Sequence, residues 1–361
     1  MKVYVELPQS LDVAEWRRRN ARGLAPDATP YGLHRLADLQ TTVVFRRSWP
    51  GQFTQPLRVL KSRSHGYEVL PALVSRLSPL RRSADVVLTM DERTGLPAAL
   101  LGGGPPVVTG VAWLTSTREA WPGASALTKR ALARVAGVFT ECPAMVNTLV
   151  EEMGVPREKV YFVRFGVDEK FFSPRPWSEA IPGRVFSVGD DRFRDHDTLV
   201  AAMVDLQSAL PHATLELATT LPVQVPQGLG IVHRRRMDEA VRGCYSRASV
   251  VAVALHPTRV GSGLSVMTEA MASGRPVVAS ANPGLNAYVE HGVTGLLVPP
   301  GDTRAFRDAV ASLLEDPDRA RAMGQAGQRR VHEQFTSADF AADLRGVLQD
   351  VVHRTPRVAT A

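Results

Sequence analysis

The stretch GSGLSVMTEAMASGRPVVAS, Gly261 to Ser280, decides the fold. Its middle has the apolar content of a buried helix, and PVVAS at 276–280 has the β-branched run of a buried strand. Between the two stands a carboxylate, Glu269. Its apolar surroundings argue against a solvated helix face, so we interpret Glu269 as a ligand-binding residue.

Short β-branched runs recur on both sides of this stretch and alternate with helical patterns. This alternation predicts parallel strands with crossover helices, and therefore a doubly wound α/β fold. Residues 8–34 and 46–66 have no clear periodicity and are expected to be long loops. The predicted strands are 2–7, 41–45, 85–90, 105–113, 137–142 and 159–166 in the first half, and 185–189, 213–219, 230–234, 250–255, 276–280 and 295–299 in the second.

The chain of 361 residues is long enough for two domains. A proline-rich polar segment, FSPRPWSEAIPG at 172–183, is the predicted linker between domains at 1–176 and 183–336. Ligands of open parallel sheets bind at the carboxyl ends of the strands. Both Rossmann-like halves are therefore expected to face a central cleft.

The basic residues are concentrated in the first half of the chain. Residues 1–176 contain 24 Lys and Arg against 16 Asp and Glu, whereas the remainder contains 19 against 20. Residues 16–82 contain 13 against 3, together with the aromatic residues Trp16, Trp49 and Phe53. This region suits either an anionic membrane surface or a solvated arginine-rich surface. No nucleic-acid-binding motif accompanies it, so a nucleic-acid partner is not expected.

Neither an apolar run of about 20 residues nor a secretory signal is visible, so a cytoplasmic protein is expected, with a peripheral place on the inner face of the cell membrane as an alternative. The two cysteines, Cys142 and Cys244, form no disulfide framework and have no metal-ligand spacing around them. We therefore expect both to be small buried residues, and no metal site.

A helix over 263–273 would follow the strand at 250–255, so its N-terminus would lie at a carboxyl end of the sheet. Backbone N–H groups and the helix dipole attract phosphate there, and Gly261 and Gly263 allow close approach. Glu269 would lie about two turns deeper, where it can accept hydrogen bonds from ribose hydroxyls. Four polar residues share one stripe of this helix: Ser262, Ser265, Glu269 and Ser273.

The run LHPTRVGSGLSVMTEAMASGRPVVAS (255–280), followed by NPGLNAYVEHGVTGLLVPPGD (282–302), resembles the donor-binding half of retaining glycosyltransferases of family 4. The segments 149–174 and 335–351 resemble the interdomain segment and the C-terminal helix of that family. The resemblance covers residues 130–350 well and 1–129 loosely. It implies the GT-B fold, a nucleotide-diphosphate sugar as donor, no metal or other cofactor, and a helix at 337–353 that completes the first domain.

The resemblance also implies roles for individual residues. Glu269 matches the glutamate that binds the ribose hydroxyls, and Arg194 falls near the lysine that binds the diphosphate, with Arg192 as a second candidate. A cation is needed there because the leaving nucleoside diphosphate gains negative charge. Gly32 matches the glycine loop of the first domain. The other donor-site candidates are Gly189, His256, Gly261, Ser262, Gly263, Leu264 and Ser265.

The sequence departs from the family pattern in three places. Gly261 stands where a second glutamate contacts the donor sugar, and Asp190 stands where an arginine is common. The usual histidine of the first domain is not evident, and GVAWLTS (110–116) occupies its place. An unusual donor sugar with fewer hydroxyls would fit these changes.

No acid or base residue is identified, which a retaining front-face mechanism tolerates because the leaving phosphate can take the acceptor proton. Asp91 and Glu92 are either acceptor contacts or surface turn residues. His256 either lines the donor site or is structural, and we expect His196 to be structural. The run at 233–236, HRRR, is either a solvated edge or an anion contact.

These observations predict a retaining, hexosyltransferase-like enzyme (EC 2.4) that uses a UDP-, TDP- or GDP-sugar. The basic N-terminal half would bind the acceptor, which is a glycan, a lipid-linked glycan or a small molecule. Two alternatives remain open: a non-catalytic nucleotide-sugar-binding partner of another transferase, and an epimerase or phosphorylase of the same fold.

Overall fold

The computed structural model describes residues 1–47, 67–115 and 124–355. The chain forms two compact units. The N-terminal unit comprises Met1–Arg22, Asp27–Arg164 and Phe340–Ala361, and the C-terminal unit comprises Gly23–Pro26 and Phe165–Asp339. The boundary along the chain therefore falls at Arg164, before the proline-rich segment at 172–183. Trp49, Phe53 and nearly all of the expected loop at 46–66 lie outside the described residues.

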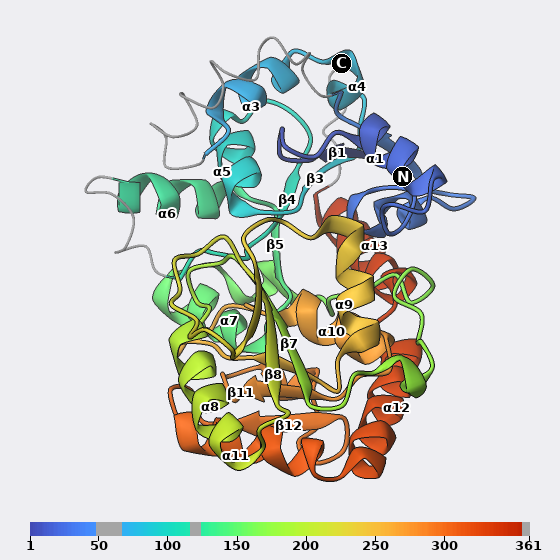
Figure 1. Cartoon of the computed structure of the whole chain (residues 1–361). Coiled ribbons are helices and arrows are strands. Elements are labelled where there is room, and N and C mark those ends of the chain that lie inside the picture. Colours follow the sequence, from blue (N-terminus) through green and yellow to red (C-terminus); the bar gives the residue numbers. More distant parts are fainter. Residues whose placement is uncertain (48–66, 116–123, 356–361) are drawn as a thin grey trace, which may run out of the picture. The chain divides into compact units, whose positions relative to one another are not determined.

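The sheet of the N-terminal unit has six parallel strands in the order β2-β1-β3-β4-β5-β6 (Figure 1). Each strand corresponds to one of the predicted runs, so the strand prediction for this half is confirmed. The strand order reverses between β1 and β3, because β2 is added on one side of β1 and all later strands on the other. The bounds are β1 Lys2–Glu6, β2 Thr42–Phe45, β3 Val86–Thr89, β4 Val107–Gly110, β5 Gly137–Thr140 and β6 Val160–Phe162.

Helices cover both faces of this sheet. The C-terminal helix α13, Ser337–Arg354, packs on one face, where Leu344 and Leu348 join Val5 and Leu88 in a buried cluster. The other helices of the unit are α1 Val13–Ala21, α3 Val69–Arg76, α4 Pro79–Arg82, α5 Glu92–Leu101, α6 Ala124–Arg134 and α7 Pro143–Asn147.

The expectation of a structureless loop over 8–34 is wrong. Helix α1 lies within it, and a 3₁₀ segment spans Pro30–Leu36. The carboxylate of Asp12 caps α1 by accepting a hydrogen bond from the Glu15 N–H at 2.7 Å. No residue of α1 is fully buried, so the sequence shows no apolar periodicity there.

The C-terminal unit has a second sheet of six parallel strands, in the order β12-β11-β10-β7-β8-β9. This is the order of dinucleotide-binding folds, and the predicted two-domain, doubly wound α/β class is confirmed. The bounds are β7 Arg184–Val188, β8 Thr214–Ala218, β9 Gly230–His233, β10 Val250–Val253, β11 Val277–Ser280 and β12 Gly295–Val298.

Two apolar clusters fill the two faces of this second sheet. One lies under α9 (Val241–Arg247) and α10 (Leu264–Ala272), and the other lies under α8 (His196–Ala209) and α11 (Thr303–Leu314). A further helix, α12 (Pro317–Gln334), packs against α10 (Figure 1). Asp302 caps α11 by accepting from the Ala305 N–H at 2.8 Å.

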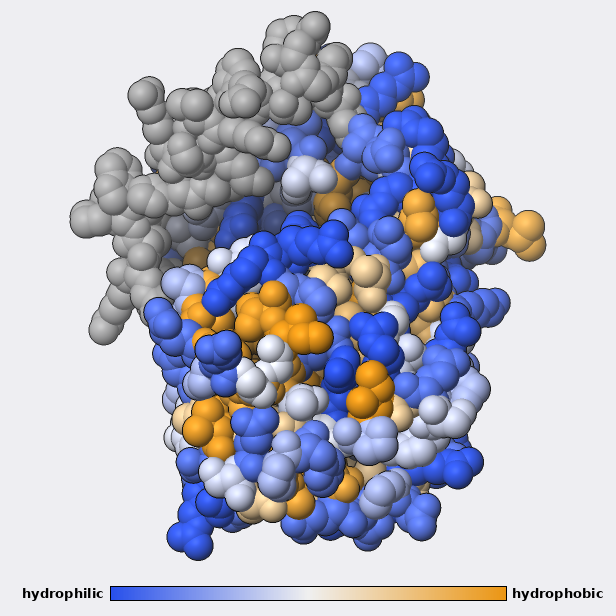
Figure 2. Space-filling view, viewed as in Figure 1, coloured by the Kyte–Doolittle hydropathy of each residue, from blue (hydrophilic) through white to orange (hydrophobic). Residues whose placement is uncertain are grey.

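Among the described residues, no helix combines the length and apolar character that crossing a membrane requires. On the face shown in Figure 2, hydrophilic residues predominate over the C-terminal unit and hydrophobic ones form small groups between them.

Candidate active site

The candidate site lies at the carboxyl ends of β7 and β10, where the strand order of the second sheet reverses. Open α/β sheets bind their ligands outside such a switch point. Gly189 directly follows β7, and the loop after β10 leads into α10. The fold thus brings the stretch that opens the sequence analysis to the expected place.

Gly263 forms the N-terminal cap of α10, and two features of the position favour glycine strongly. Its φ is +81°, and a Cβ atom there would lie 2.7 Å from Cγ1 of Val253. Because Gly263 has no side chain, no side-chain cap occupies the first turn of α10, which suits an external acceptor such as phosphate. Leu264 is buried behind them and Ser265 is exposed.

Arg194 lies beside this helix N-terminus. Its guanidinium is buried, and Nη1 has no hydrogen-bond partner in the described part of the chain. Nη1 would lie 3.7 Å from a Cβ atom built on Gly263. A buried guanidinium with an unused donor, next to a helix N-terminus, is suited to an anionic ligand.

Asp191 fixes this arrangement, and sequence reasoning missed it. Its Oδ2 accepts from Nε of Arg194 at 2.7 Å, and its Oδ1 accepts from the hydroxyl of the buried Ser262 at 2.8 Å. Gly189 completes the support, because a Cβ atom there would lie 2.2 Å from Nε of Arg194. Any side chain at 189 would therefore displace the guanidinium.

The second candidate cation, Arg192, takes a different position. Its side chain is exposed, and its guanidinium stacks 4.8 Å from the ring centre of Phe193. The geometry therefore favours Arg194 over Arg192 as the group that meets a diphosphate.

Glu269 is held by a tyrosine from the neighbouring helix α9. The hydroxyl of Tyr245 donates to Oε2 of Glu269 at 2.8 Å. Burial raises the pKa of Glu269 to about 7, against the opposing effects of this hydrogen bond and of the Arg194 charge. Since Oε1 accepts no hydrogen bond from the described residues, one oxygen is available to a ligand hydroxyl. Arg194 and Glu269 are thus near enough for the Arg194 charge to act on the carboxylate.

Arg275, in the SGRPVVA run, supports Tyr245 from behind. It is fully buried, with Nε donating to the Tyr245 carbonyl at 3.1 Å and Nη2 donating to the Ser246 carbonyl at 2.6 Å. Its guanidinium lies 4.9 Å from the ring centre of Trp177. These contacts link Arg275 to Glu269 through Tyr245, which is 24 residues away from Glu269 in the sequence, and the sequence analysis identified only Glu269.

Asp190 occupies the position where an arginine is common, and it has a structural role. Its Oδ1 accepts from the Thr220 hydroxyl at 2.9 Å and from the Thr219 hydroxyl at 3.3 Å. Burial opposes ionisation, but these bonds lower the pKa of Asp190. Asp190 therefore anchors the loop after β8.

The two histidines near the site differ. His196 is buried, with Nε2 at 3.1 Å from the Gly189 carbonyl oxygen, which is a structural position. The side chain of His256 is half exposed, with Nδ1 at 3.6 Å from Oδ2 of Asp195, and it follows β10 on the side of the site. Gly261 lies at the end of the same loop, and its carbonyl oxygen is 3.4 Å from the Leu264 nitrogen.

In the N-terminal unit, Asp91 and Glu92 follow β3 and both engage the backbone. Asp91 caps α5 by accepting from the Thr94 N–H at 3.0 Å. Glu92 is buried and accepts from the Ala112 and Trp113 N–H groups at 3.0 and 3.1 Å. Glu92 therefore holds the turn after β4 through both of its carboxylate oxygens.

Two residues that the sequence analysis missed, Tyr31 and Glu141, are near enough to interact with each other, and Tyr31 also interacts with Asp91. Tyr31 and Gly32 both have left-handed backbone conformations, with φ of 58° and 65°. Desolvation, and then the carboxylates of Glu141 and Asp91, raise the pKa of Tyr31. Burial raises the pKa of Glu141 to about 7. A tyrosine in this strained conformation is uncommon and is typical of functional loops.

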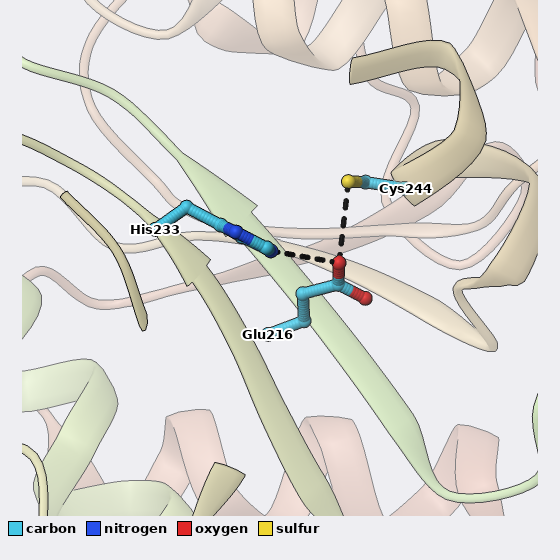
Figure 3. A group of neighbouring side chains, drawn as sticks. All are labelled: Glu216, His233 and Cys244. Carbon is cyan, nitrogen blue, oxygen red and sulfur yellow. Dashed lines mark hydrogen bonds and ion pairs between the residues drawn. The ribbon is translucent and has the colours of Figure 1, made fainter. Parts of the chain in front are cut away.

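A third polar cluster, formed by Glu216, His233 and Cys244, has ligand atoms within 4.8 Å of one another (Figure 3). Glu216 also accepts from Arg184 and Arg247, each at 3.1 Å. Burial and Glu216 raise the pKa of Cys244 to about 12, so the thiol stays protonated. Two guanidiniums and a protonated thiol do not fit a metal ion, and the group is an ion-pair network.

His233 begins the basic run at 233–236, so that run has one member in this network. Arg234 donates to the Leu221 and Val223 carbonyls at 2.7 and 2.6 Å. These two side chains therefore bind their own domain, and Arg235 and Arg236 are exposed.

Comparisons with known proteins agree with this geometry. Residues 184–316 match the family described as glycosyl transferases group 1. The chain is 24% identical to an MMP alpha-(1->4)-mannosyltransferase of Mycolicibacterium hassiacum, over 90% of this chain and 83% of that protein. It is 29% identical to a D-inositol 3-phosphate glycosyltransferase of Thermobispora bispora, over 62% of this chain and 57% of that protein.

Among solved structures, sucrose-phosphate synthase from Thermosynechococcus elongatus shares the fold, with a TM-score of 0.72, 19% identity, and coverage of 98% of this chain and 100% of that one. HepE of Anabaena in complex with UDP-glucose has a TM-score of 0.68 and 16% identity, covering 97% of this chain and 100% of that one. Fold and site thus define a protein of the GT-B class. The recognition made from the sequence is confirmed as a resemblance: residues 184–316 match the glycosyl transferases of group 1, and the chain as a whole has the GT-B fold.

Proposed function

We propose that the protein transfers a sugar from a nucleoside-diphosphate sugar to an acceptor hydroxyl, with retention of anomeric configuration. The observation that carries the proposal is the buried Arg194 guanidinium, whose Nη1 has no hydrogen-bond partner among the described residues and lies against the uncapped N-terminus of α10. HepE, which shares the fold, was crystallised in complex with UDP-glucose, and this supports a nucleotide sugar as donor.

The diphosphate would lie on the first-turn amides of α10 and on Arg194. Charge builds up on the leaving diphosphate as the glycosidic bond breaks, and prearranged donors stabilise that charge without reorganisation. Asp191 holds Arg194 in place, so the guanidinium is oriented before the donor arrives. In this proposal, Arg194 and the helix N-terminus supply the positive charge and no metal ion is needed.

The ribose would bind Glu269, which presents Oε1 while Tyr245 occupies Oε2. A carboxylate that accepts a hydrogen bond from a ribose hydroxyl would bind best when ionised. Since the pKa of Glu269 is raised to about 7, donor binding should strengthen as the pH rises through 7.

The acceptor would bind the N-terminal unit, at the carboxyl ends of β3 and β5. Asp91 and Glu141 follow these strands, and Tyr31 interacts with both carboxylates. Carboxylate and phenol oxygens suit an acceptor rich in hydroxyl groups. With retention, the leaving phosphate takes the acceptor proton, so these groups need only position the acceptor.

Calorimetric titration with UDP, TDP and GDP tests the donor site. We expect one nucleotide to bind the wild type and Glu269→Ala to weaken it by about 1–3 kcal/mol, the cost of unpairing buried polar groups. Glu315→Ala, at an exposed position at the end of α11, is the matched control and should bind normally. If no nucleotide binds the folded wild type, the donor site is refuted.

Turnover distinguishes the enzyme from its alternatives. A retaining transferase consumes donor and acceptor together, and proton NMR of the first product shows the donor's anomeric configuration. Nucleotide-sugar binding without turnover, across a panel of hydroxyl acceptors, would favour the non-catalytic partner instead. Turnover without acceptor, or dependence on inorganic phosphate, would favour an epimerase or a phosphorylase.

A further inference from the structure

We propose that the outer surface of α3, α4 and α6, the basic-aliphatic surface, docks on an anionic lipid membrane. The first observation is an unusual concentration of exposed aliphatic side chains. Of the thirteen large hydrophobic side chains exposed in the described part of the chain, six lie in these helices or at their ends. They are Val69, Leu73, Val74, Leu77, Leu80 and Leu127.

The aliphatic residues of α3 form a stripe that points away from the domain. Val69, Leu73 and Leu77 recur every four residues, so they share one face of the helix. The buried residues of this helix are the smaller ones, Pro71, Ala72 and Ser75. Leu77 is 66% exposed. A helix that buries its small residues and exposes its leucines is arranged for an external apolar partner.

The charge of the same surface has one sign. Helices α3, α4 and α6 contain no aspartate or glutamate. The neighbouring carboxylate of Glu68 is buried, where it accepts from the Gln9 N–H and pairs with Arg46. The exposed basic residues among the leucines are Arg76, Arg82, Lys129 and Arg130.

The helices form one continuous surface. Helix α5 packs against both α3 and α6. Tyr67, directly before α3, forms a side-chain hydrogen bond with Thr128 of α6. The exposed Leu127 is therefore next to the start of the aliphatic stripe.

The sequence predicted a membrane-binding region over 16–82, and the structure excludes helix α1 from it. Helix α1 carries the Arg17–Arg19 run, but none of the exposed large hydrophobic residues lies on it. Its aromatic residue, Trp16, is partly buried and donates through Nε1 to the Asp27 carbonyl at 3.3 Å. Basic charge without exposed apolar groups is typical of a solvated surface, and α1 therefore belongs to that class.

A lipid surface fits this combination better than other partners. Aliphatic side chains enter the boundary between headgroups and acyl chains, and arginine and lysine pair with anionic headgroups around them. A nucleic acid would meet the charge but leave the leucines unused. The inference is independent of the donor site. Membrane docking would bring the proposed acceptor side of the enzyme to lipid-linked molecules.

Vesicle flotation tests the proposal with the full-length protein. One set of vesicles is phosphatidylcholine alone, and the other is an equimolar mixture with phosphatidylglycerol. We expect binding to the mixed vesicles at low salt, and about tenfold or greater weakening in the double variant Leu77→Ser, Leu80→Ser, since two apolar anchors are lost. Lys129→Gln with Arg130→Gln should weaken binding and reduce its salt dependence. Val293→Ser removes an equally exposed hydrophobic residue from the C-terminal unit and should change nothing.

Thermal unfolding of each variant shows that both units are folded, and nucleotide titration separates this test from that of the donor site. The proposal is overturned if the wild type binds a nucleotide but not the mixed vesicles at low salt. It is also overturned if the leucine variant binds vesicles normally, or if that variant converts a wild-type oligomer to a monomer, which would make the surface a protein interface.

Discussion

Replacing Glu269 with glutamine should stabilise the protein at high pH while weakening nucleotide binding. The amide keeps the shape of the side chain and still has an oxygen that accepts from Tyr245, which donates to Oε2 at 2.8 Å. It removes the charge that burial disfavours. A carboxylate retained for structure would give the opposite result, because its loss would destabilise the protein.

The magnitude follows from the pKa. The pKa of Glu269 is raised from 4.5 to about 7, so the folded state binds the proton more tightly than the unfolded state does. The stability from this proton is fully present below pH 4.5 and is lost as the pH rises through 7. A difference of about 2.5 pKa units corresponds to a loss of up to about 3 kcal/mol. Glutamine does not titrate, so the variant escapes this loss.

Urea denaturation at pH 5 and pH 8 measures the effect. The free energy of unfolding of Glu269→Gln minus that of the wild type should be larger at pH 8 than at pH 5, by up to about 3 kcal/mol. Nucleotide affinity should fall roughly 10- to 100-fold, because hydrogen bonds to a charged group are lost. Glu315→Gln serves as the exposed control. Equal destabilisation of Glu269→Gln at both pH values would refute the reasoning.

Two further substitutions test the residues that shape the donor site, and the addition of zinc tests the cluster of Glu216, His233 and Cys244. Gly263→Ala should cost about 1–3 kcal/mol more than Gly292→Ala in thermal unfolding, because both have φ near +80° but only the first meets a side chain. Arg275→Ala should lower stability by about 3 kcal/mol or more, since it opens a cavity and unpairs buried carbonyls; an unchanged Tm would contradict that role. Zinc should leave the Tm unchanged, and a rise that Cys244→Ala abolishes would show a metal site instead.

The strands were the part of the fold that the sequence predicted well. Parallel strands buried on both faces, such as VVAV at 250–253, are continuous β-branched runs that few other structures require. Helix α1 was missed because it is held by the Asp12 cap and carries no buried apolar stripe. Periodicity shows burial, and an exposed helix gives no such signal.

The site residues likewise fall into some that the sequence identified and others that it missed. Glu269 and Gly263 were identified because they lie in one run, where helix spacing relates them. Asp191, Tyr245 and Arg275 act through contacts with residues far away in the sequence, such as the hydrogen bond from Ser262 to Asp191 across 71 residues. Sequence spacing does not encode such contacts. Burial also decided the role of Glu92, since a carboxylate next to a helix start looks the same whether it binds backbone or substrate.

The most direct test of the central claim is a crystal structure of the protein with the nucleoside diphosphate that binds it. We expect the diphosphate on the amides of residues 263–265 and on Nη1 of Arg194, and a ribose hydroxyl within hydrogen-bond distance of Oε1 of Glu269. A nucleotide bound elsewhere, with Arg194 and Glu269 making no contact to it, would contradict the account.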